Sequence, residues 1–316
     1  MKKILTSVCA TALFTSAFAL DVSEDKTITD GISTINFTAP NVTLTITGKH
    51  DQLWYSPRAN FGDDYVYTDG DKVTVKLESG ASIWLNDTQG GLFGGDTVSS
   101  SKVDMYITGS GKIQTTLASI TTTNSRGKLF LDAYTDFTDA TYNIGSATLP
   151  TNLTVSNTLI AKSITLISGS TLTLASDSDS SANILTTANS TIRGTIIQKA
   201  GVYTVQGATT NLYGTLDLSV SKGFKTRWLT VHNGSTIIIR ADNALMESDT
   251  AYRVYAIAKD ATTTLKLYAD QQFADLWFAN DNTTGTLNAY TNGNALTFAG
   301  INSTGTLNIF IEKDFS

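Results

Sequence analysis

The chain has 316 residues, of which 16% are charged, and its 22 basic and 28 acidic residues give a net charge of −6. Charged residues are well below the roughly 25% of an ordinary soluble domain, so the polar surface consists mainly of hydroxyl and amide groups. No cluster of Lys and Arg follows one segment as phosphate neutralisation requires, which excludes a basic nucleic-acid binder.

Residues 1–19 have the order of a secretory signal peptide. Lys2 and Lys3 precede an apolar stretch, and Ala17-Phe18-Ala19 supplies small residues for cleavage. The apolar run is shorter than the about 20 residues that cross a bilayer, so we expect a leader that is removed and not an anchor. The single cysteine, Cys9, lies inside this leader. Cleavage would therefore leave an exported chain that cannot form disulfides.

Residues 20–70 contain N-terminal strands and a segment rich in aromatic residues. The aromatic residues of this segment and just downstream that could form one patch are Trp54, Tyr55, Tyr65, Tyr67 and Trp84. Aromatic faces stack on sugar rings, so these five residues predict a glycan-binding patch. Large aromatics would equally shield the first coil of a solenoid, and both interpretations stay open at this point.

Residues 71–316 alternate apolar and hydroxyl residues in short groups that end at Gly, Asn or Ser. Val73-Thr74-Val75 and Ile164-Thr165-Leu166 are typical, and this period of two with β-branched residues predicts strands. Only residues 270–278 have a weak helical pattern, which predicts one or two turns of helix. Residues 124–152 and 241–263 are expected to be loops.

Turn motifs recur with a spacing near 20 residues. Tetrapeptides of the Gly-Ser-Thr-Leu type place apolar residues at Leu172, Ile192, Leu212 and Ile237, which are 20, 20 and 25 residues apart. A repeat of about 20 residues with two or three short strands predicts the coil of a right-handed parallel β-helix, a β-solenoid. An antiparallel β-sandwich also has closely spaced turns and is the alternative fold.

The leader, the mature chain without cysteine, the low charge and the Gly-Ser-Thr-Leu-Thr-Leu type of coil together resemble the passenger region of bacterial autotransporters and related surface adhesins. The resemblance implies an exported β-helix that binds a glycan or protein of a host or neighbouring cell. In that family a C-terminal membrane barrel of at least eight strands anchors the passenger. After Leu307 this chain has room for one more strand, through Ile311. Either a separate outer-membrane translocator is the partner, or the solenoid is secreted or periplasmic by another route.

Polysaccharide lyases and glycosidases also use β-helices, so a carbohydrate-active enzyme is the alternative function. Asp63 and Asp64 look a little like the paired carboxylates of polygalacturonases, but no Gly-His-Gly or Arg-x-Lys accompanies them. The two histidines are His50 and His232, and we expect His232, at a Val-His-Asn-Gly corner, to be a solvent-facing turn residue. These observations favour a non-catalytic protein without a cofactor.

The sequence also contains patterns that are typical of calcium-binding and of ice-binding proteins. Asp69-Gly70-Asp71 and Asp177-Ser178-Asp179 offer closely spaced oxygen ligands, yet solvated turns account for them without a metal. Thr171-Leu172-Thr173 has the Thr-x-Thr pattern of flat ice-binding arrays. Such an array would need the pattern in successive coils, and residues 189–193 already interrupt it.

Overall fold

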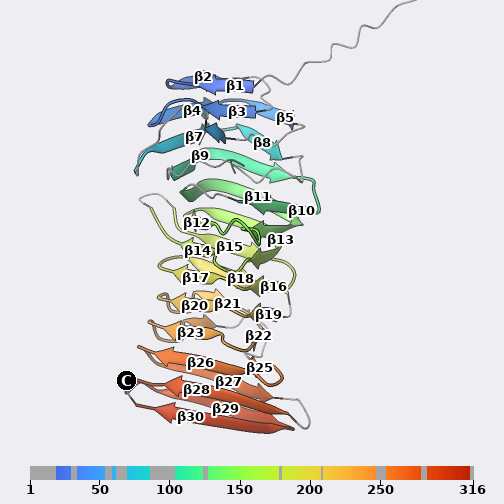
Figure 1. Ribbon diagram of the computed structural model, residues 1–316, viewed down its shortest axis with the longest axis vertical. Coiled ribbons are helices and arrows are strands. Elements are labelled where there is room, and N and C mark those ends of the chain that lie inside the picture. The colour runs from blue at the N-terminus through green and yellow to red at the C-terminus, as the bar shows by residue number, and fades with distance from the viewer. Residues whose placement is uncertain are drawn as a thin grey trace, which may run out of the picture.

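The computed structural model describes residues 19–29, 34–53, 59–61, 70–85, 104–123, 127–177, 180–207, 209–246, 254–278 and 283–313. These residues form an all-β solenoid without helices. Its coils stack along the long axis, from β1 (Ala19–Val22) and β2 (Lys26–Ile28) at one end to β30 (Thr306–Glu312) at the other (Figure 1). Within the described part of the chain there is consequently no helix that could span a membrane.

Three faces of parallel strands enclose the core, and the long strands continue round corners from one face to the next. The first face contains β2, β4 (Val42–Ile46), β7 (Lys72–Leu77), β9 (Asp104–Thr115), β11 (Lys128–Ile144), β12 (Asn152–Val155), β14 (Thr171–Leu174), β17 (Thr195–Gln198), β20 (Thr215–Leu218), β23 (Thr236–Ile239), β26 (Thr262–Leu267), β28 (Thr284–Tyr290) and β30. The second face contains β5 (Lys49–Leu53), β8 (Ser82–Leu85), the later parts of β9 and β11, β13 (Thr158–Leu166), β15 (Asn183–Thr186), β18 (Val202–Val205), β21 (Phe224–Lys225), β24 (Leu245–Met246), β27 (Gln271–Phe278) and β29 (Leu296–Ser303).

The third face contains β10 (Ser119–Thr122), the ends of β11, β13, β27 and β29, and β16 (Ser190–Ile192), β19 (Thr209–Leu212), β22 (Trp228–Val231) and β25 (Val254–Ile257). A separate three-stranded sheet of β1, β3 (Thr34–Phe37) and β6 (Ala59–Phe61) lies at the N-terminal end. All pairings between these strands are parallel, and the one antiparallel contact among the described residues is an isolated bridge between Ser176 and Ser181. The β-solenoid is thus confirmed, and the β-sandwich is excluded.

Alternation along each strand separates the core from the surface. In β14, Leu172 and Leu174 are fully buried, whereas Thr171 and Thr173 are partly exposed. Leu172 is the register partner of Leu153 in the coil before and of Ile196 in the coil after. Inward apolar residues therefore form a continuous column, in which burying each side chain contributes about 1.5–3 kcal/mol.

The predicted coil spacing of about 20 residues holds for some coils, such as the step from Gln198 to Leu218, whereas others are longer, such as the step from Val75 to Ile107, and the predicted alignment mixes two faces. Ile192 and Leu212 are register partners on the third face, 20 residues apart as predicted. Leu172 lies on the first face and pairs with Ile196, so the step from Leu172 to Ile192 is not a coil. The step from Leu212 to Ile237 is wrong for the same reason, because Ile237 also lies on the first face. Similar Ser-Thr corners precede strands of both faces, and they cannot be told apart by composition.

Three local predictions are wrong. Residues 128–144 form the 17-residue strand β11 within the predicted loop 124–152, and this strand turns through the corners of all three faces. Residues 271–278 form strand β27 and not a helix. Its buried Phe273 and Leu276 are three residues apart because the strand turns a corner between them, and this spacing imitates a helical period. The predicted loop 241–263 contains the strands β24 and β25.

Side-chain hydrogen bonds and glycine corners keep successive coils as close together as neighbouring strands of a sheet. Gln271 replaces a missing strand pairing, because its amide accepts from the Leu245 backbone N–H and donates to the Leu245 carbonyl, both at 3.2 Å. At the corner before β20, a Cβ on Gly214 would lie only 1.9 Å from the Gly194 carbonyl oxygen. Glycine is therefore required there by close approach of two coils.

Candidate functional site

One of the five aromatic residues predicted to bind a glycan lies among the described residues, and it is Trp84 on β8. The other four lie outside them: Trp54, Tyr55, Tyr65 and Tyr67. Trp84 points outward on the second face and is partly exposed, whereas its neighbours Ile83 and Leu85 are fully buried. The structure therefore presents this indole at the surface, as glycan binding requires.

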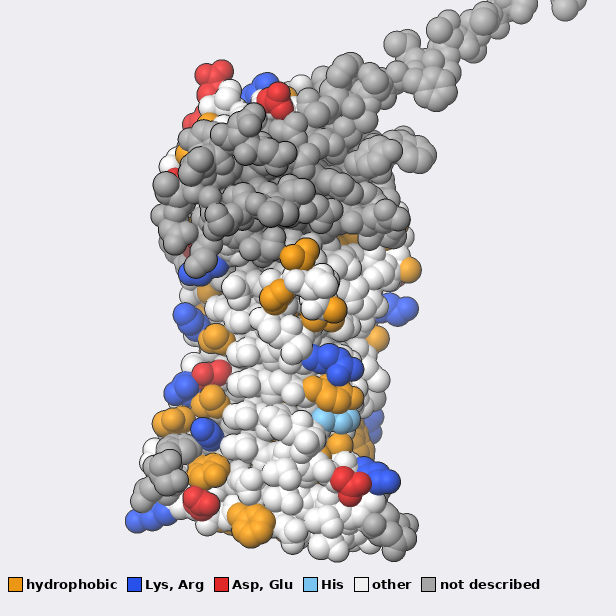
Figure 2. All heavy atoms as spheres, viewed as in Figure 1, with side chains coloured by type: hydrophobic (Ala, Val, Ile, Leu, Met, Phe, Trp, Pro, Cys, Tyr) orange, Lys and Arg blue, Asp and Glu red, His pale blue; other side chains and the backbone are white. Residues whose placement is uncertain are grey.

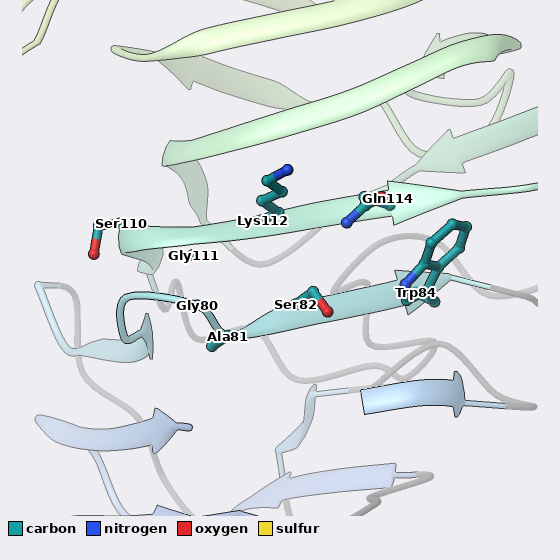
Figure 3. A pocket seen from close by; sticks show the side chains of 8 residues that line it. All are labelled: Gly80, Ala81, Ser82, Trp84, Ser110, Gly111, Lys112 and Gln114. Atoms are coloured by element: carbon teal, nitrogen blue, oxygen red, sulfur yellow. The ribbon is translucent and has the colours of Figure 1, made fainter. Parts of the chain in front are cut away.

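Two shallow depressions flank Trp84. The first has a volume of about 360 Å³ and is lined by Ser82, Lys112 and Gln114, among others (Figure 3). In Figure 3, Trp84 reaches from β8 toward Gln114 on β9, which is its register partner. The second depression, of about 280 Å³, lies on the other side of Trp84 and includes Asp136 of β11. Among the residues that the structure describes, Trp84 is the one aromatic residue that lines either depression and could stack on a sugar ring.

A larger groove lies on the first face, where the sequence predicted no site. It has a volume of about 420 Å³ and extends over β7, β9, β11 and β12 to the segment after β14. Tyr106 of β9 and Phe130 of β11 are register partners, and their rings stack with centroids 4.2 Å apart and 7° between their planes. Lys72 Nζ lies 5.8 Å from the centre of the Tyr106 ring. Aromatic surface and an ammonium group thus meet on one open face.

Two carboxyl groups, those of Asp132 and Asp177, line the opposite end of this groove. Asp132 Oδ1 accepts hydrogen bonds from Ser156 Oγ at 2.9 Å and from Ser180 Oγ at 3.0 Å, and its Oδ2 accepts one from Thr108 Oγ1 at 3.2 Å. Burial raises the pKa of Asp132, the hydroxyls of Ser156 and Ser180 oppose that rise, and a hydrogen bond with Asp177 adds to it. The negative charge of Asp177 raises the pKa of Asp132 further, because two neighbouring carboxylates repel each other.

The segment that follows β14 forms a fixed wall of the groove. Asp177 Oδ1 accepts hydrogen bonds from the Ser180 backbone N–H at 2.7 Å and from Ser180 Oγ at 3.0 Å. The bridge between Ser176 and Ser181 and the hydrogen bond from the Ala182 N–H to the Ala175 carbonyl at 2.9 Å close this short excursion. The wall is therefore positioned before any ligand arrives.

A second aromatic column runs along a corner of the third face. The Arg193 guanidinium carbon lies 4.3 Å from the centre of the Tyr213 ring, and the Tyr213 and His232 rings stack at 3.8 Å with 10° between their planes. Burial lowers the pKa of His232, and the charge of Arg193 lowers it further. His232 thus lies on the outer surface at the predicted corner, where the Tyr213 ring covers part of it. Each ring covers the next, which suits a ladder between coils better than a ligand site.

Hydroxyl and amide side chains on the third face bond mainly to one another. Thr141 Oγ1 and Ser163 Oγ are 3.1 Å apart in adjacent coils, and Asn143 Nδ2 donates to Ser119 Oγ at 3.0 Å. In Figure 2 the flank below the grey atoms is mainly white, the colour of backbone and of side chains that are neither apolar nor charged. This low charge agrees with the composition of the chain.

The array that ice binding would require is absent from the first face. Its threonine row is regular and consists of Thr171, Thr195, Thr215, Thr236 and Thr264. The row beside it consists of Thr173, Ile197, Asp217, Ile238 and Lys266. Among these five coils, a Thr-x-Thr pair therefore occurs in β14, at Thr171 and Thr173, and again only in β26, where Thr262 and Thr264 lie one outward position earlier in the register, so the pairs of these described coils do not align into an array.

The remaining candidate residues receive little support. Asp63, Asp64, Asp69 and Asp179 and the side chain of His50 lie outside the described residues. Among the residues that the structure does describe, no group of three or more His, Cys, Asp or Glu could hold a metal ion. Asp177 lies close to Asp132, but two carboxyl groups provide fewer oxygen atoms than the six to eight ligands that calcium takes.

Comparison of the chain with protein-family models, with curated proteins and with solved structures finds no match. Functional inference therefore depends on the geometry itself. That geometry consists of the groove with Tyr106, Phe130 and Asp132 on the first face and of the single indole of Trp84 on the second.

Proposed function

We propose that this protein is an exported bacterial β-solenoid that acts at the cell surface as a non-catalytic adhesin and binds glycans through its flanks. The observation that carries the proposal is the groove on the first face, where the stacked rings of Tyr106 and Phe130 meet hydroxyl and carboxyl groups. Sugars present apolar ring faces and hydroxyl edges, and this combination of surfaces complements both.

The shape of the site supports adhesion. The groove and the depressions beside Trp84 are open to solvent and shallow, so each would bind a sugar with modest affinity. Many copies on one cell would raise the avidity well above that of a single site. The signal-peptide pattern of residues 1–19 supports export, and an outer-membrane translocator is the partner that would keep the solenoid at the surface.

The test is a binding screen of residues 20–316 on a glycan array and on extracellular-matrix proteins. We expect glycan binding that is lost when Tyr106 and Phe130 are both replaced by Ala. Tyr290→Ala is the matched control, because Tyr290 is also an outward residue of the first face but lies far along the solenoid in β28. Failure of the wild-type chain to bind any glycan would overturn the proposal and leave a structural role.

A second candidate function, cleavage of a polysaccharide, is favoured by the pairing of Asp132 with Asp177 in the same groove. Glycosidases hold their two carboxyls about 5–10 Å apart, with the sugar between them. Here the carboxyls share a hydrogen bond, and hydroxyls occupy both oxygens of Asp132. These hydrogen bonds suit a carboxyl group that fixes the wall of the groove better than one that transfers a proton to a sugar. Release of reducing ends from bound polysaccharide, abolished by Asp132→Asn, would instead establish the enzyme.

A further inference from the structure

The aromatic pair in the groove has a defined orientation relative to the solenoid. Tyr106 and Phe130 are register partners in successive coils, so the line joining their ring centres runs nearly along the solenoid axis. The 4.2 Å separation is close to the about 4.8 Å between neighbouring strands, and the planes differ by 7°. The planes of both rings therefore lie roughly perpendicular to the solenoid axis.

Both outer faces of this stack have a threonine as register partner, Thr74 beyond Tyr106 and Thr154 beyond Phe130, and they differ in that a lysine ammonium lies over the Tyr106 side alone among the described residues. Beyond Tyr106, toward the N-terminal end, Lys72 Nζ already lies over the ring at 5.8 Å. Beyond Phe130 the register partner is Thr154, whose short side chain lines the groove. The coil that contains Thr154 thus leaves a gap of one layer beside the Phe130 ring. A flat ring of the size of a sugar is what would extend the stack there.

The polar groups around this gap are acidic or neutral. Asp132 and Ser156 lie beside it on the same face, and Asp177 stands on its C-terminal side. Lys72 lies on the far side of the aromatic pair, two ring layers away from the gap. Carboxylates accept hydrogen bonds from sugar hydroxyls and from amino groups, whereas they repel a carboxylate or sulfate on the ligand.

We propose that this gap binds the terminal sugar of a glycan, stacked on Phe130 above Thr154, with a preference for neutral or amino sugars over acidic ones. Because the sugar ring lies perpendicular to the solenoid axis, the rest of the glycan projects away from the flank and does not run along it. This inference rests on the proposed function and adds to it the position, the orientation and the class of the ligand.

The first arm of the experiment tests the position with substitutions in the gap. Thr154→Leu fills the gap and leaves both rings in place, so we expect it to weaken glycan binding at least tenfold. Thr173→Leu is the matched control, since Thr173 is the register partner of Thr154 in the next coil and does not line the groove. Equal binding by both variants and the wild type would overturn the proposed position. Thermal unfolding of each variant shows whether it remains folded.

The second arm tests the class of ligand with oligosaccharides that differ only in their terminal sugar. We expect termini that are neutral hexoses or amino sugars to bind at least tenfold more tightly than uronic-acid or sialic-acid termini, and internal positions of a long polysaccharide to bind weakly. Asp177→Asn should narrow the difference between neutral and acidic termini. Equal or tighter binding of acidic termini by the wild type would overturn the preference.

The outcomes separate this inference from the adhesin proposal. A wild-type chain that binds no glycan contradicts both. A wild-type chain whose glycan binding survives Thr154→Leu and Phe130→Ala but is lost in Trp84→Ala contradicts only the inference, because adhesion would then use the second face.

Discussion

Inward and outward side chains of the same strands follow different rules in this solenoid. Along β12, β14, β17 and β20 one inward row reads Leu153, Leu172, Ile196 and Leu216. The adjacent outward row reads Thr154, Thr173, Ile197 and Asp217. The backbone is equivalent at every step, yet the first row is uniformly aliphatic and the second is mixed. The inward row is constrained by packing, and the outward row is free to carry binding groups.

The largest expected effect comes from an inward residue. Leu216→Ala would leave a cavity in the continuous core column, and we expect it to lower the free energy of unfolding by about 3 kcal/mol. Thr215→Ala changes the outward neighbour and should stay within about 0.5 kcal/mol of the wild type. Urea unfolding of both variants measures the contrast. Equal effects would show that the inward row is not the main source of stability.

Gly214 lies at a corner between two strands and belongs to neither row. Its substitution tests how close two successive coils must lie. Gly214→Ala would place a Cβ 1.9 Å from the Gly194 carbonyl oxygen, so two coils must separate, at an expected cost of about 2–3 kcal/mol. Gly234→Ala is the control, because Gly234 has a φ of 79° and open space around it. Its cost should be about 1 kcal/mol, from backbone strain alone. Chemical denaturation gives both values, and a larger loss for Gly234→Ala would contradict the close approach.

Gln198 interrupts a second inward row of the same strands, and we expect its replacement by an apolar residue to stabilise the fold. It occupies the position between Leu174 and Leu218, and its buried Oε1 has no hydrogen-bond partner among the described residues. Its Nε2 donates to the Gly201 carbonyl at 3.0 Å. Because an unpaired buried acceptor is costly, Gln198→Leu should raise the free energy of unfolding by about 1 kcal/mol. Destabilisation measured by thermal or urea unfolding would instead assign the amide an essential role at this corner.

The smallest expected effect is a pH dependence from the outward column of Arg193, Tyr213 and His232. Burial and Arg193 hold the pKa of His232 below the 6.5 of a free imidazole, so the folded chain takes up this proton less readily than the unfolded chain. The stabilisation is present above pH 6.5 and is lost as the pH falls below it. Wild type should therefore lose more thermal stability than His232→Asn between pH 7.5 and 5.5. A parallel loss in both proteins would contradict this account.

The fold could be predicted from the sequence because the inward row leaves a periodic signal. Alternation in segments such as Val42–Ile46 marks each strand, and corners recur once or more in every coil. The alignment of coils could not be predicted, since Leu172 and Ile192 follow similar corners on different faces. Lys128–Ile144 escaped detection because its alternation is interrupted where the strand turns.

The groove was missed for a related reason. Tyr106 and Phe130 are 24 residues apart and become neighbours only once the register of two coils is known. A search for aromatic residues that are close in sequence instead found Trp54, Tyr55, Tyr65 and Tyr67, which lie outside the described residues. Trp84 was included because it follows that segment closely in the sequence, and it is the member of the group that lies among the described residues. Outward aromatics separated by the length of one coil are therefore the pattern to search for in chains of this kind.

The pairing of each strand with only the coils before and after it has a mechanical consequence. Tension on one end of the chain acts on the hydrogen bonds and apolar contacts of a single coil at a time, since none of the described strands pairs with a coil beyond its neighbours. The terminal coil would peel away while the others stay folded, and the tether would lengthen in steps of roughly one coil. If the solenoid acts as the proposed adhesin, a cell held by it would experience a nearly constant restraining force, and the unfolded coils would refold when the load falls.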